Sequence, residues 1–317
     1  MKALFFDGRV SIAELPLPQP KTGEALIKVL RAGICRTDLE IIEGYMNFQG
    51  ILGHEFVGLV EESPSSFLRG KRVVGEINIG CDECAWCLAN LSRHCPHRRV
   101  LGIKGKDGAF AQYLTLPEKN LHLLPQTMSD DEGVFVEPLA AAFEIEEQII
   151  IKPEDSVAVI GDGRLGQLVA QLIHLRGCSL LAIGKHRNKL RLLEKIGIST
   201  ELFSERIEEK FDLIVECSGS PQGLELALKL IKPRGRIILK STINRPYSFD
   251  FTQVVINEVQ FIGSRCGPFE PAIKLLDRGL IKVEQLISAH FSLEQGLEAL
   301  QFVRQKKGIK VILTLGK

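Results

Sequence analysis

The chain has 317 residues, of which 45% are hydrophobic and 25% are charged, so collagen-like, disordered and coiled-coil folds are excluded. Forty Lys and Arg against 39 Asp and Glu leave a net charge of +1, which argues against a large nucleic-acid or anionic-membrane surface. The apolar runs are far shorter than the roughly 20 residues of a bilayer span, and the start MKALFFDGRV lacks the features of a secretion signal. We therefore expect a cytoplasmic protein of about two domains, with neither a membrane nor a nucleic acid as partner.

The pattern of predicted secondary structure changes part-way along the chain. Short β-type runs that Gly and Pro interrupt, such as ALIKVLRAG and FVGLVEE, fill the first 125 residues and predict a compact β-barrel. From about Asp155, strands and helices alternate, which predicts a parallel sheet with helices on both faces. The expected strands are DSVAVI, CSLLAIG, FDLIVECSG, RGRIILKS and VQFIGS; helical segments and a final strand, KVILTL, follow.

The first of these strands runs directly into a glycine-rich turn, GDGRLG, and an amphipathic helix follows. In this context the loop predicts a dinucleotide site, in which the backbone approaches the pyrophosphate and the helix N-terminus faces the phosphates. The alternative is a plain strand-to-helix turn, which the regular alternation around it disfavours. The candidate cofactor contacts in the loop are Gly161, Gly163, Arg164, Leu165 and Gly166.

The end of the second expected strand bears on which dinucleotide binds. An NAD site places Asp or Glu there to hydrogen-bond the ribose 2′-hydroxyl, whereas this chain has Gly184, followed by Lys185, His186 and Arg187. We expect no carboxylate at this position, and three potential cations for a 2′-phosphate. The pattern therefore favours NADP(H) over NAD(H), the alternative being that these side chains form only a solvated basic turn.

Four of the eight cysteines fall within fifteen residues, with the spacing CxxCxxCx₇C. Four thiolates at this spacing can close a tetrahedral shell around one zinc ion, and a closed shell is structural rather than catalytic. A nucleic-acid zinc ribbon would require basic dominance elsewhere, and a redox CxxC pair would leave two cysteines without a role. The candidate ligands of this structural zinc are Cys81, Cys84, Cys87 and Cys95.

Five motifs stand in one order: GICRTD, GHEFVG, the four-cysteine segment, FVEPLA and the glycine loop. In this order the chain resembles the zinc-dependent medium-chain alcohol dehydrogenases. It is most similar to their sorbitol and threonine dehydrogenase branch, because Glu137 stands where the liver-type enzymes carry a ligand cysteine. The resemblance implies an α/β protein: a GroES-like β-barrel catalytic domain, 1–137 completed by 266–317, and a doubly wound Rossmann domain, 138–265.

The resemblance also implies a catalytic zinc, which gives two zinc ions per chain. Cys35 and His54 would bind the metal, and Glu55 and Glu137 would share the remaining protein contacts directly or through water. One thiolate and one carboxylate neutralise Zn²⁺, whereas a second carboxylate would weaken its pull on a substrate oxygen. We therefore expect one of the two glutamates to bind indirectly or to exchange.

Three residues near Cys35 match positions around the family's catalytic zinc. Thr37 matches the hydroxyl that carries the proton away from the substrate, and Asp38 matches the carboxylate that orients the zinc-binding His. Glu40 departs from the family, because many relatives have a His there at the outer end of the proton relay. Arg265 stands where related enzymes place an arginine near the cofactor or the substrate.

The expected function is zinc-dependent hydride transfer between a secondary alcohol or polyol, or the matching ketone or aldehyde, and NADP(H) or NAD(H). The partner is a small molecule, and the resemblance implies a homodimer or homotetramer. A zinc-free quinone or enone reductase of the same superfamily would lack both the four-cysteine segment and the set of Cys35, His54 and Glu55. The remaining alternative is a non-catalytic dinucleotide sensor that retains the dehydrogenase fold.

Overall fold

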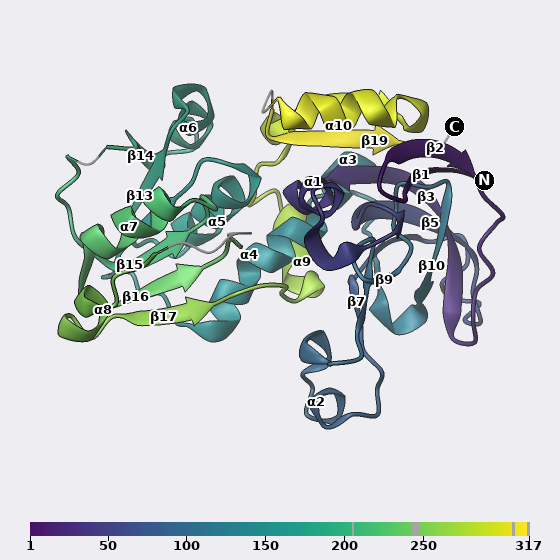
Figure 1. Ribbon diagram of the computed structural model, residues 1–317, viewed down its shortest axis with the longest axis horizontal. Helices are drawn as coiled ribbons and strands as arrows, with labels where there is room; N and C mark the ends of the chain where they lie inside the picture. Colours follow the sequence, from purple (N-terminus) through teal and green to yellow (C-terminus); the bar gives the residue numbers. More distant parts are fainter. Residues whose placement is uncertain (205, 243–247, 306–307, 316–317) are drawn as a thin grey trace. The chain divides into compact units, whose positions relative to one another are not determined.

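A computed structural model of the protein describes residues 1–204, 206–242, 248–305 and 308–315 (Figure 1). The chain divides into two compact units. Unit 1 comprises Met1–Glu137 and Phe269–Lys317, and unit 2 comprises Pro138–Pro268. Among the described residues, none of the helices combines the length and the apolar character that crossing a bilayer requires.

Unit 1 is built on a seven-stranded sheet with the order β11-β6-β5-β3-β19-β18, in which β10 also pairs with β3. The long strand β3 is central, because the residues at both of its ends are buried and it pairs along most of its length. Its last residues lie opposite the first residue of β5 and the beginning of β19. The strands are β3 (Glu24–Ile34), β5 (Glu55–Glu62), β6 (Arg72–Gly75), β10 (Tyr113–Pro117), β11 (Leu121–Leu123), β18 (Ile287–Ser292) and β19 (Lys310–Thr314).

Two three-stranded sheets complete the strands of unit 1, with the orders β2-β1-β4 and β7-β8-β9. Their strands are β1 (Lys2–Phe6), β2 (Val10–Glu14), β4 (Gly50–Ile51), β7 (Asn78–Ile79), β8 (Arg99–Leu101) and β9 (Gly105–Lys106). The α-helices of unit 1 are α1 (Arg36–Ile42), α2 (Ala85–Leu88), α3 (Asp130–Gly133), α9 (Phe269–Asp277) and α10 (Gly296–Arg304). The yellow α10 runs beside β19 (Figure 1). The short 3₁₀ helices are η1 (Tyr45–Asn47), η2 (Ser92–His94), η3 (Glu118–Asn120), η4 (Glu284–Leu286) and η5 (Leu293–Gln295).

Unit 2 contains a six-stranded parallel sheet with the order β14-β13-β12-β15-β16-β17. The strand order reverses at β12, and ligands of such sheets bind outside the carboxyl ends of the strands at this point. The strands are β12 (Ser156–Ile160), β13 (Ser179–Gly184), β14 (Ser199–Leu202), β15 (Phe211–Glu216), β16 (Ile231–Leu239) and β17 (Gln260–Gly263). The helices are α4 (Val136–Gln148), whose first two residues belong to unit 1, α5 (Arg164–His174), α6 (Arg187–Glu194), α7 (Pro221–Leu230) and α8 (Thr252–Ile256).

The sequence pattern predicts five of these six strands and misses β14. This strand reads STEL, lies at the edge of the sheet and is mostly exposed, so it has no apolar run that would mark it. The sequence pattern also gives no prediction for α4, although VEPLAAAFEIEEQ forms thirteen residues of helix. The predicted parallel sheet itself is present.

Candidate functional site

Three side chains that can bind a metal converge at one end of the central strands of unit 1. Cys35 follows β3 directly and caps α1, while His54 and Glu55 stand at the beginning of β5. The strand register places Gly33 opposite Glu55, which brings these two chain segments together. One ligand atom from each of the three side chains lies within 4.8 Å of the other two. His54 and Glu55 are buried, and Cys35 is half-buried.

The carboxylate of Asp38 connects both segments. It is fully buried and accepts hydrogen bonds from the backbone N–H of Cys35 at 2.7 Å and from that of Gly53 at 3.2 Å. Its Oδ1 also lies 3.3 Å from Nδ1 of His54. Burial disfavours a charged imidazole, but Asp38 and Cys35 outweigh this effect and raise the pKa of His54 well above its usual value. Asp38 therefore favours a proton on Nδ1 and leaves Nε2 as the metal-binding atom.

Thr37 and Glu40 both lie on α1, three positions apart, so their side chains share one face of the helix. Oγ1 of Thr37 lies 3.7 Å from Sγ of Cys35. Glu40 forms an ion pair with Arg36, with 3.6 Å between Oε1 and Nε. Burial raises the pKa of Glu40, and the positive charge of Arg36 only partly opposes this shift.

Sequence reasoning missed Lys310, whose Nζ forms an ion pair with Glu55. Both side chains are completely buried, and Lys310 is the first residue of β19. Burial lowers the pKa of Lys310 to about 7, although the negative charges of Cys35 and Asp38 oppose the shift. A side chain at Gly33 would clash here, because its Cβ would lie 2.6 Å from Oε2 of Glu55.

The donor set fits zinc. Thiolate, imidazole and carboxylate are all zinc ligands, and three protein ligands with one open position are typical of catalytic sites. A tetrahedral shell with bonds of about 2.0 to 2.3 Å has ligand atoms about 3.3 to 3.8 Å apart, so side chains whose ligand atoms lie within 4.8 Å of one another need only small shifts to share one ion. Glu137, the second residue of α4, is half-buried and does not belong to this closely spaced group.

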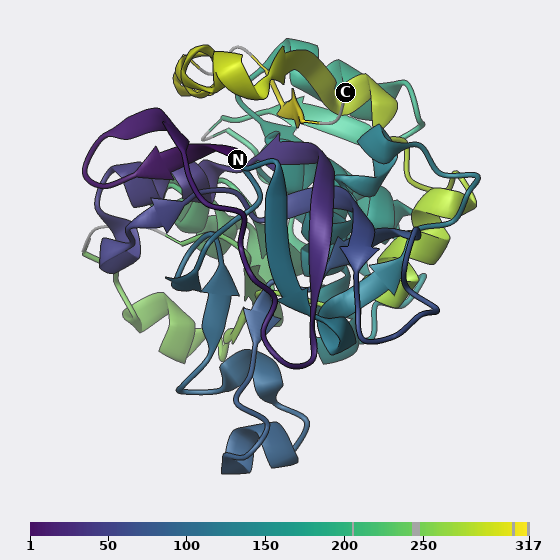
Figure 2. The ribbon, with the colours of Figure 1, turned by 90° about the vertical axis from the view of Figure 1, so that its right-hand side faces the viewer.

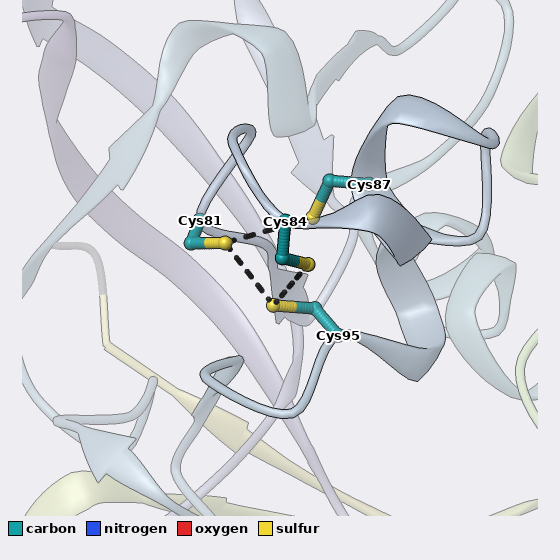
Figure 3. Close-up of side chains that lie close together, drawn as sticks. All are labelled: Cys81, Cys84, Cys87 and Cys95. Carbon is teal, nitrogen blue, oxygen red and sulfur yellow. Dashed lines mark hydrogen bonds between the residues drawn. The ribbon is translucent and has the colours of Figure 1, made fainter.

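The four clustered cysteines form a second group of ligand atoms within 4.8 Å of one another, in a lobe around α2 and η2 (Figure 3). The Sγ atoms of Cys81 and Cys95 lie 3.5 Å apart, those of Cys84 and Cys95 3.7 Å, and those of Cys81 and Cys87 4.0 Å. A tetrahedron with Zn–S bonds of about 2.3 Å has edges of about 3.8 Å, so the four thiols fit one zinc ion.

The lobe extends away from the rest of unit 1 (Figures 1 and 2). Backbone N–H groups of Glu83 and Cys84 lower the pKa of Cys81 to about 6, whereas burial raises that of Cys87 to about 11. Trp86 lies between two of the ligand cysteines and is half exposed. The lobe has few buried apolar side chains, so a metal ion would be its main source of stability.

In unit 2 the glycine loop connects β12 to α5, as the sequence predicts. Gly161 has φ +125°, and a Cβ there would lie 2.8 Å from the backbone of Cys217. Nothing lies within 4 Å of a Cβ at Gly163, so this part of the backbone is open to a ligand. Arg164 and Leu165 open α5, with Gly163 as the N-cap. The loop therefore presents backbone and a helix N-terminus, as pyrophosphate binding requires.

The turn that supports Gly161 depends on Glu216, another residue that sequence reasoning missed. Glu216 ends β15, is 2% exposed and accepts a hydrogen bond from the backbone N–H of Ser218 at 2.6 Å. Burial raises its pKa, although the hydrogen bonds from Ser218 and the Gly219 backbone oppose the shift. Burial also raises the pKa of the Cys217 thiol, as expected of a packing residue.

The expectation that no carboxylate lies at the end of the second strand is wrong. The carboxylate of Asp162 reaches this position from the glycine loop, and a Cβ at Gly184 would lie 2.5 Å from Cβ of Asp162. Asp162 accepts a hydrogen bond from the backbone N–H of His186 at 2.6 Å, and its oxygens lie 3.0 Å from the ring Nδ1. An acid on the strand itself would be visible from its place after the glycine loop, whereas this carboxylate belongs to the loop and reaches the strand only in the folded chain.

The three predicted cations are exposed, and each has a neighbour. Nζ of Lys185 lies 5.0 Å from the centre of the Phe203 ring, His186 pairs with Asp162, and Arg187 lies 3.6 Å from Glu194. Arg265 follows β17, where its carbonyl accepts a hydrogen bond from Lys240 at 2.9 Å.

Comparisons with known proteins identify the family of the chain. A family model described as the alcohol dehydrogenase GroES-like domain matches residues 21–126, and one described as zinc-binding dehydrogenase matches residues 165–278. The chain belongs to the zinc-dependent medium-chain alcohol dehydrogenase family. The predicted combination of a GroES-like domain and a Rossmann domain with a doubly wound parallel sheet is thereby confirmed.

The relatives of this alcohol dehydrogenase family member extend over its whole length. A sorbitol dehydrogenase from Halalkalibacterium halodurans is 28% identical over 97% of this chain and 96% of the relative. A structure from Escherichia coli CFT073, named as an alcohol dehydrogenase and complexed with NADH, has a TM-score of 0.91 at 27% identity and covers 99% of each chain. One from Sinorhizobium meliloti 1021 bound to NADP has a TM-score of 0.89 at 26% identity, over 99% and 98%. The protein is an oxidoreductase with dehydrogenase relatives.

The two ligand groups predict the metal content of the dehydrogenase. Protein purified without chelator should contain about two equivalents of zinc per chain. Cys35→Ala or His54→Ala should lose one equivalent together with activity, while the exposed His174→Ala serves as the control and should lose neither. Metal analysis by mass spectrometry is the measurement, and a stable single equivalent with full activity contradicts the assignment.

The cysteine lobe should stabilise the protein through its metal. Cys84→Ser should lower the melting temperature and change the emission of Trp86, because the incomplete ligand set no longer holds zinc. Cys266→Ser, at a half-buried position in unit 2, should leave the zinc-dependent emission unchanged. Unaltered Trp86 emission and melting temperature in Cys84→Ser would show that the lobe is not a closed metal site.

The buried pair of Lys310 and Glu55 predicts a coupled effect on stability. Lys310→Met leaves a buried carboxylate without its counter-charge, which costs about 3 to 5 kcal/mol of unfolding free energy. Adding Glu55→Gln should recover most of this loss. Urea denaturation of the zinc-free protein measures the effect, with Lys274→Met on the exposed face of α9 as control. Equal stability of Lys310→Met and the unchanged protein contradicts the interpretation.

Proposed function

We propose that the protein transfers a hydride between a secondary alcohol or polyol, or the matching carbonyl compound, and NADP(H), with NAD(H) as the weaker cofactor. The observation that carries the proposal is the convergence of Cys35, His54 and Glu55, whose ligand atoms lie within 4.8 Å of one another. The glycine loop of unit 2 supplies the second requirement, a dinucleotide site. A dehydrogenase of this kind needs both.

Cys35 and His54 would hold the catalytic zinc, with Glu55 and Glu137 sharing the remaining contacts. The metal supplies Lewis acidity, which lowers the pKa of the substrate hydroxyl and polarises the carbonyl in the reverse direction. We expect one of the two glutamates to leave and rejoin the zinc ion. Lys310 supports this expectation for Glu55, because its ammonium group is a second cation, besides the metal, to which that carboxylate can bind. Cys81, Cys84, Cys87 and Cys95 would hold the structural zinc.

We propose that α1 carries the proton away from the substrate. Thr37 lies beside Cys35, so its hydroxyl can accept the substrate proton and pass on its own. Glu40 lies one turn further on the same face of α1, where it replaces the usual His. Its raised pKa suits a carboxylate that takes up a proton and releases it to solvent.

The relatives support the substrate class. They include proteins named sorbitol dehydrogenase, L-threonine 3-dehydrogenase and D-arabitol-phosphate dehydrogenase. Each of these names refers to a compound that has a secondary hydroxyl group. We propose the same class for this chain. The alternative, a dinucleotide sensor without turnover, is disfavoured because Cys35, His54 and Glu55 lie close together and Thr37 lies beside Cys35.

We further propose that NADP(H) is the preferred cofactor. Gly184 leaves the end of β13 without a diol-binding acid of its own, and Lys185, His186 and Arg187 are exposed close to it. Arg164 and the glycine loop would contact the pyrophosphate, and Arg265 would contact cofactor or substrate. The solved relatives include one with NADP and one with NADH, so the fold accommodates either cofactor.

Two properties of the described residues support a cytoplasmic homo-oligomer. All eight cysteines are thiols, which is typical of a reducing compartment. Helix α8 exposes Val255 and Ile256, and its N-cap Phe251 is exposed as well. Exposed apolar side chains in a group are typical of subunit contacts. We propose a homodimer or homotetramer.

A panel of polyols, amino alcohols, sugars and their carbonyl counterparts, each assayed with NADP and NAD, tests the function. We expect turnover of a secondary alcohol or polyol, with kcat/KM at least about tenfold higher for NADP, because one charge-assisted hydrogen bond contributes about 1.5 to 3 kcal/mol. Turnover that favours NAD contradicts only the cofactor proposal. Tight dinucleotide binding without turnover of any substrate supports the sensor.

A further inference from the structure

The end of β13 is shaped by a residue that does not belong to β13. Asp162 is the residue between the first two loop glycines, and it is only 7% exposed. Its Cβ and its carboxylate occupy the space into which a side chain at Gly184 would project, at 2.5 and 2.6 Å from the position of that Cβ. Because the Cβ itself is in the way, rotation of the Asp162 side chain cannot relieve the clash.

The same carboxylate also fixes His186, which lies two residues beyond Gly184. It accepts a hydrogen bond from the backbone N–H of His186, which is the N-cap of α6, and its oxygens lie 3.0 Å from Nδ1 of the ring. The His186 side chain remains 47% exposed, whereas the Asp162 side chain is 8% exposed. Nδ1 is therefore turned inward to the carboxylate, and Nε2 is the ring nitrogen left for a ligand.

We infer that Asp162 is a specificity-determining residue for the dinucleotide: it excludes a side chain at position 184 and holds His186 in its place. An imidazole then borders the ribose 2′ position where an NAD site would have a diol-binding carboxylate. This inference rests on the proposed use of a dinucleotide. The proposed cofactor preference concerns which dinucleotide binds, whereas this inference concerns the coupling of positions 162 and 184 in dinucleotide binding.

A double-mutant cycle tests this coupling, with dissociation constants for NADPH and NADH measured by fluorescence titration. Gly184→Asp alone should weaken both dinucleotides at least tenfold, because the new side chain displaces the glycine loop. Asp162→Gly combined with Gly184→Asp should recover NADH binding at least tenfold relative to Gly184→Asp and should make NADH the preferred cofactor. The ratio of the two constants separates specificity from a general structural effect.

A matched control separates volume from charge. Asp162→Asn combined with Gly184→Asp removes the repulsion between two carboxylates but keeps the obstructing Cβ, so it should not restore NADH binding. If Gly184→Asp does not fold, Gly184→Ala replaces it. We then expect Gly184→Ala to lower the melting temperature and NADPH affinity in the native background, and to be tolerated beside Asp162→Gly.

Each outcome has a separate meaning. Additive effects of the two substitutions, or a full change of preference by Gly184→Asp alone, overturn the inference. Equal recovery with Asp162→Asn also overturns it, since charge rather than space would then link the two positions. A native protein that prefers NADH contradicts only the proposed NADP(H) preference, because the coupling can still be measured. A native protein that binds neither dinucleotide contradicts both proposals.

Discussion

The buried carboxylate of Asp38 is the interaction on which the candidate metal site depends. It bonds to the backbone on both sides of the site, at Cys35 and at Gly53, and lies beside the His54 ring. His54 and Glu55 lie nineteen and twenty residues after Cys35 in the sequence. A common anchor is therefore needed to hold the three side chains in one geometry. The seven-stranded sheet provides the rigid base for this anchor, because β3 and β5 pair directly beneath it.

The ionisable groups of the candidate metal site lie close together in a largely buried space. Three acidic groups, the Cys35 thiol, Asp38 and Glu55, meet one ammonium group, Lys310. Burying unpaired charges is costly, so this excess of potential negative charge favours a divalent cation. A zinc ion at this site would compete with Lys310 for Glu55, and a stronger ion pair would weaken the binding of that carboxylate to the metal. The pairing of β19 with β3 therefore matters to the site as well as to the fold, because it brings Lys310 to Glu55.

Motifs whose residues lie close together in sequence could be predicted, and contacts between distant segments could not. The glycine loop and the cysteine lobe are each contained within fifteen residues, so their spacing alone indicates their geometry. Lys310 lies 255 residues after Glu55, and only the register of β3 with β5 and β19 brings the two together. Asp162 is within the predicted loop, but its contact with His186 depends on the spacing of two parallel strands. Strand β14 escaped prediction because an exposed edge strand has little apolar pattern.

The two candidate sites have one steric feature in common. In each, a buried carboxylate lies where a glycine on a strand would carry its Cβ if it were any other residue. Glu55 does so at Gly33, and Asp162 does so at Gly184. At both places the glycine is required for the room it leaves rather than for its backbone conformation, since neither has a positive φ. A side chain at Gly184 would clash with Cβ and the carboxylate of Asp162, and one at Gly33 would clash with Lys310, Val134 and Glu55. Either substitution would therefore disturb the imidazole that Asp162 holds or the metal ligand set. Gly33 and Gly184 are therefore each coupled to a carboxylate on another segment, Glu55 or Asp162. Substitution of either glycine should change metal or cofactor binding as well as packing.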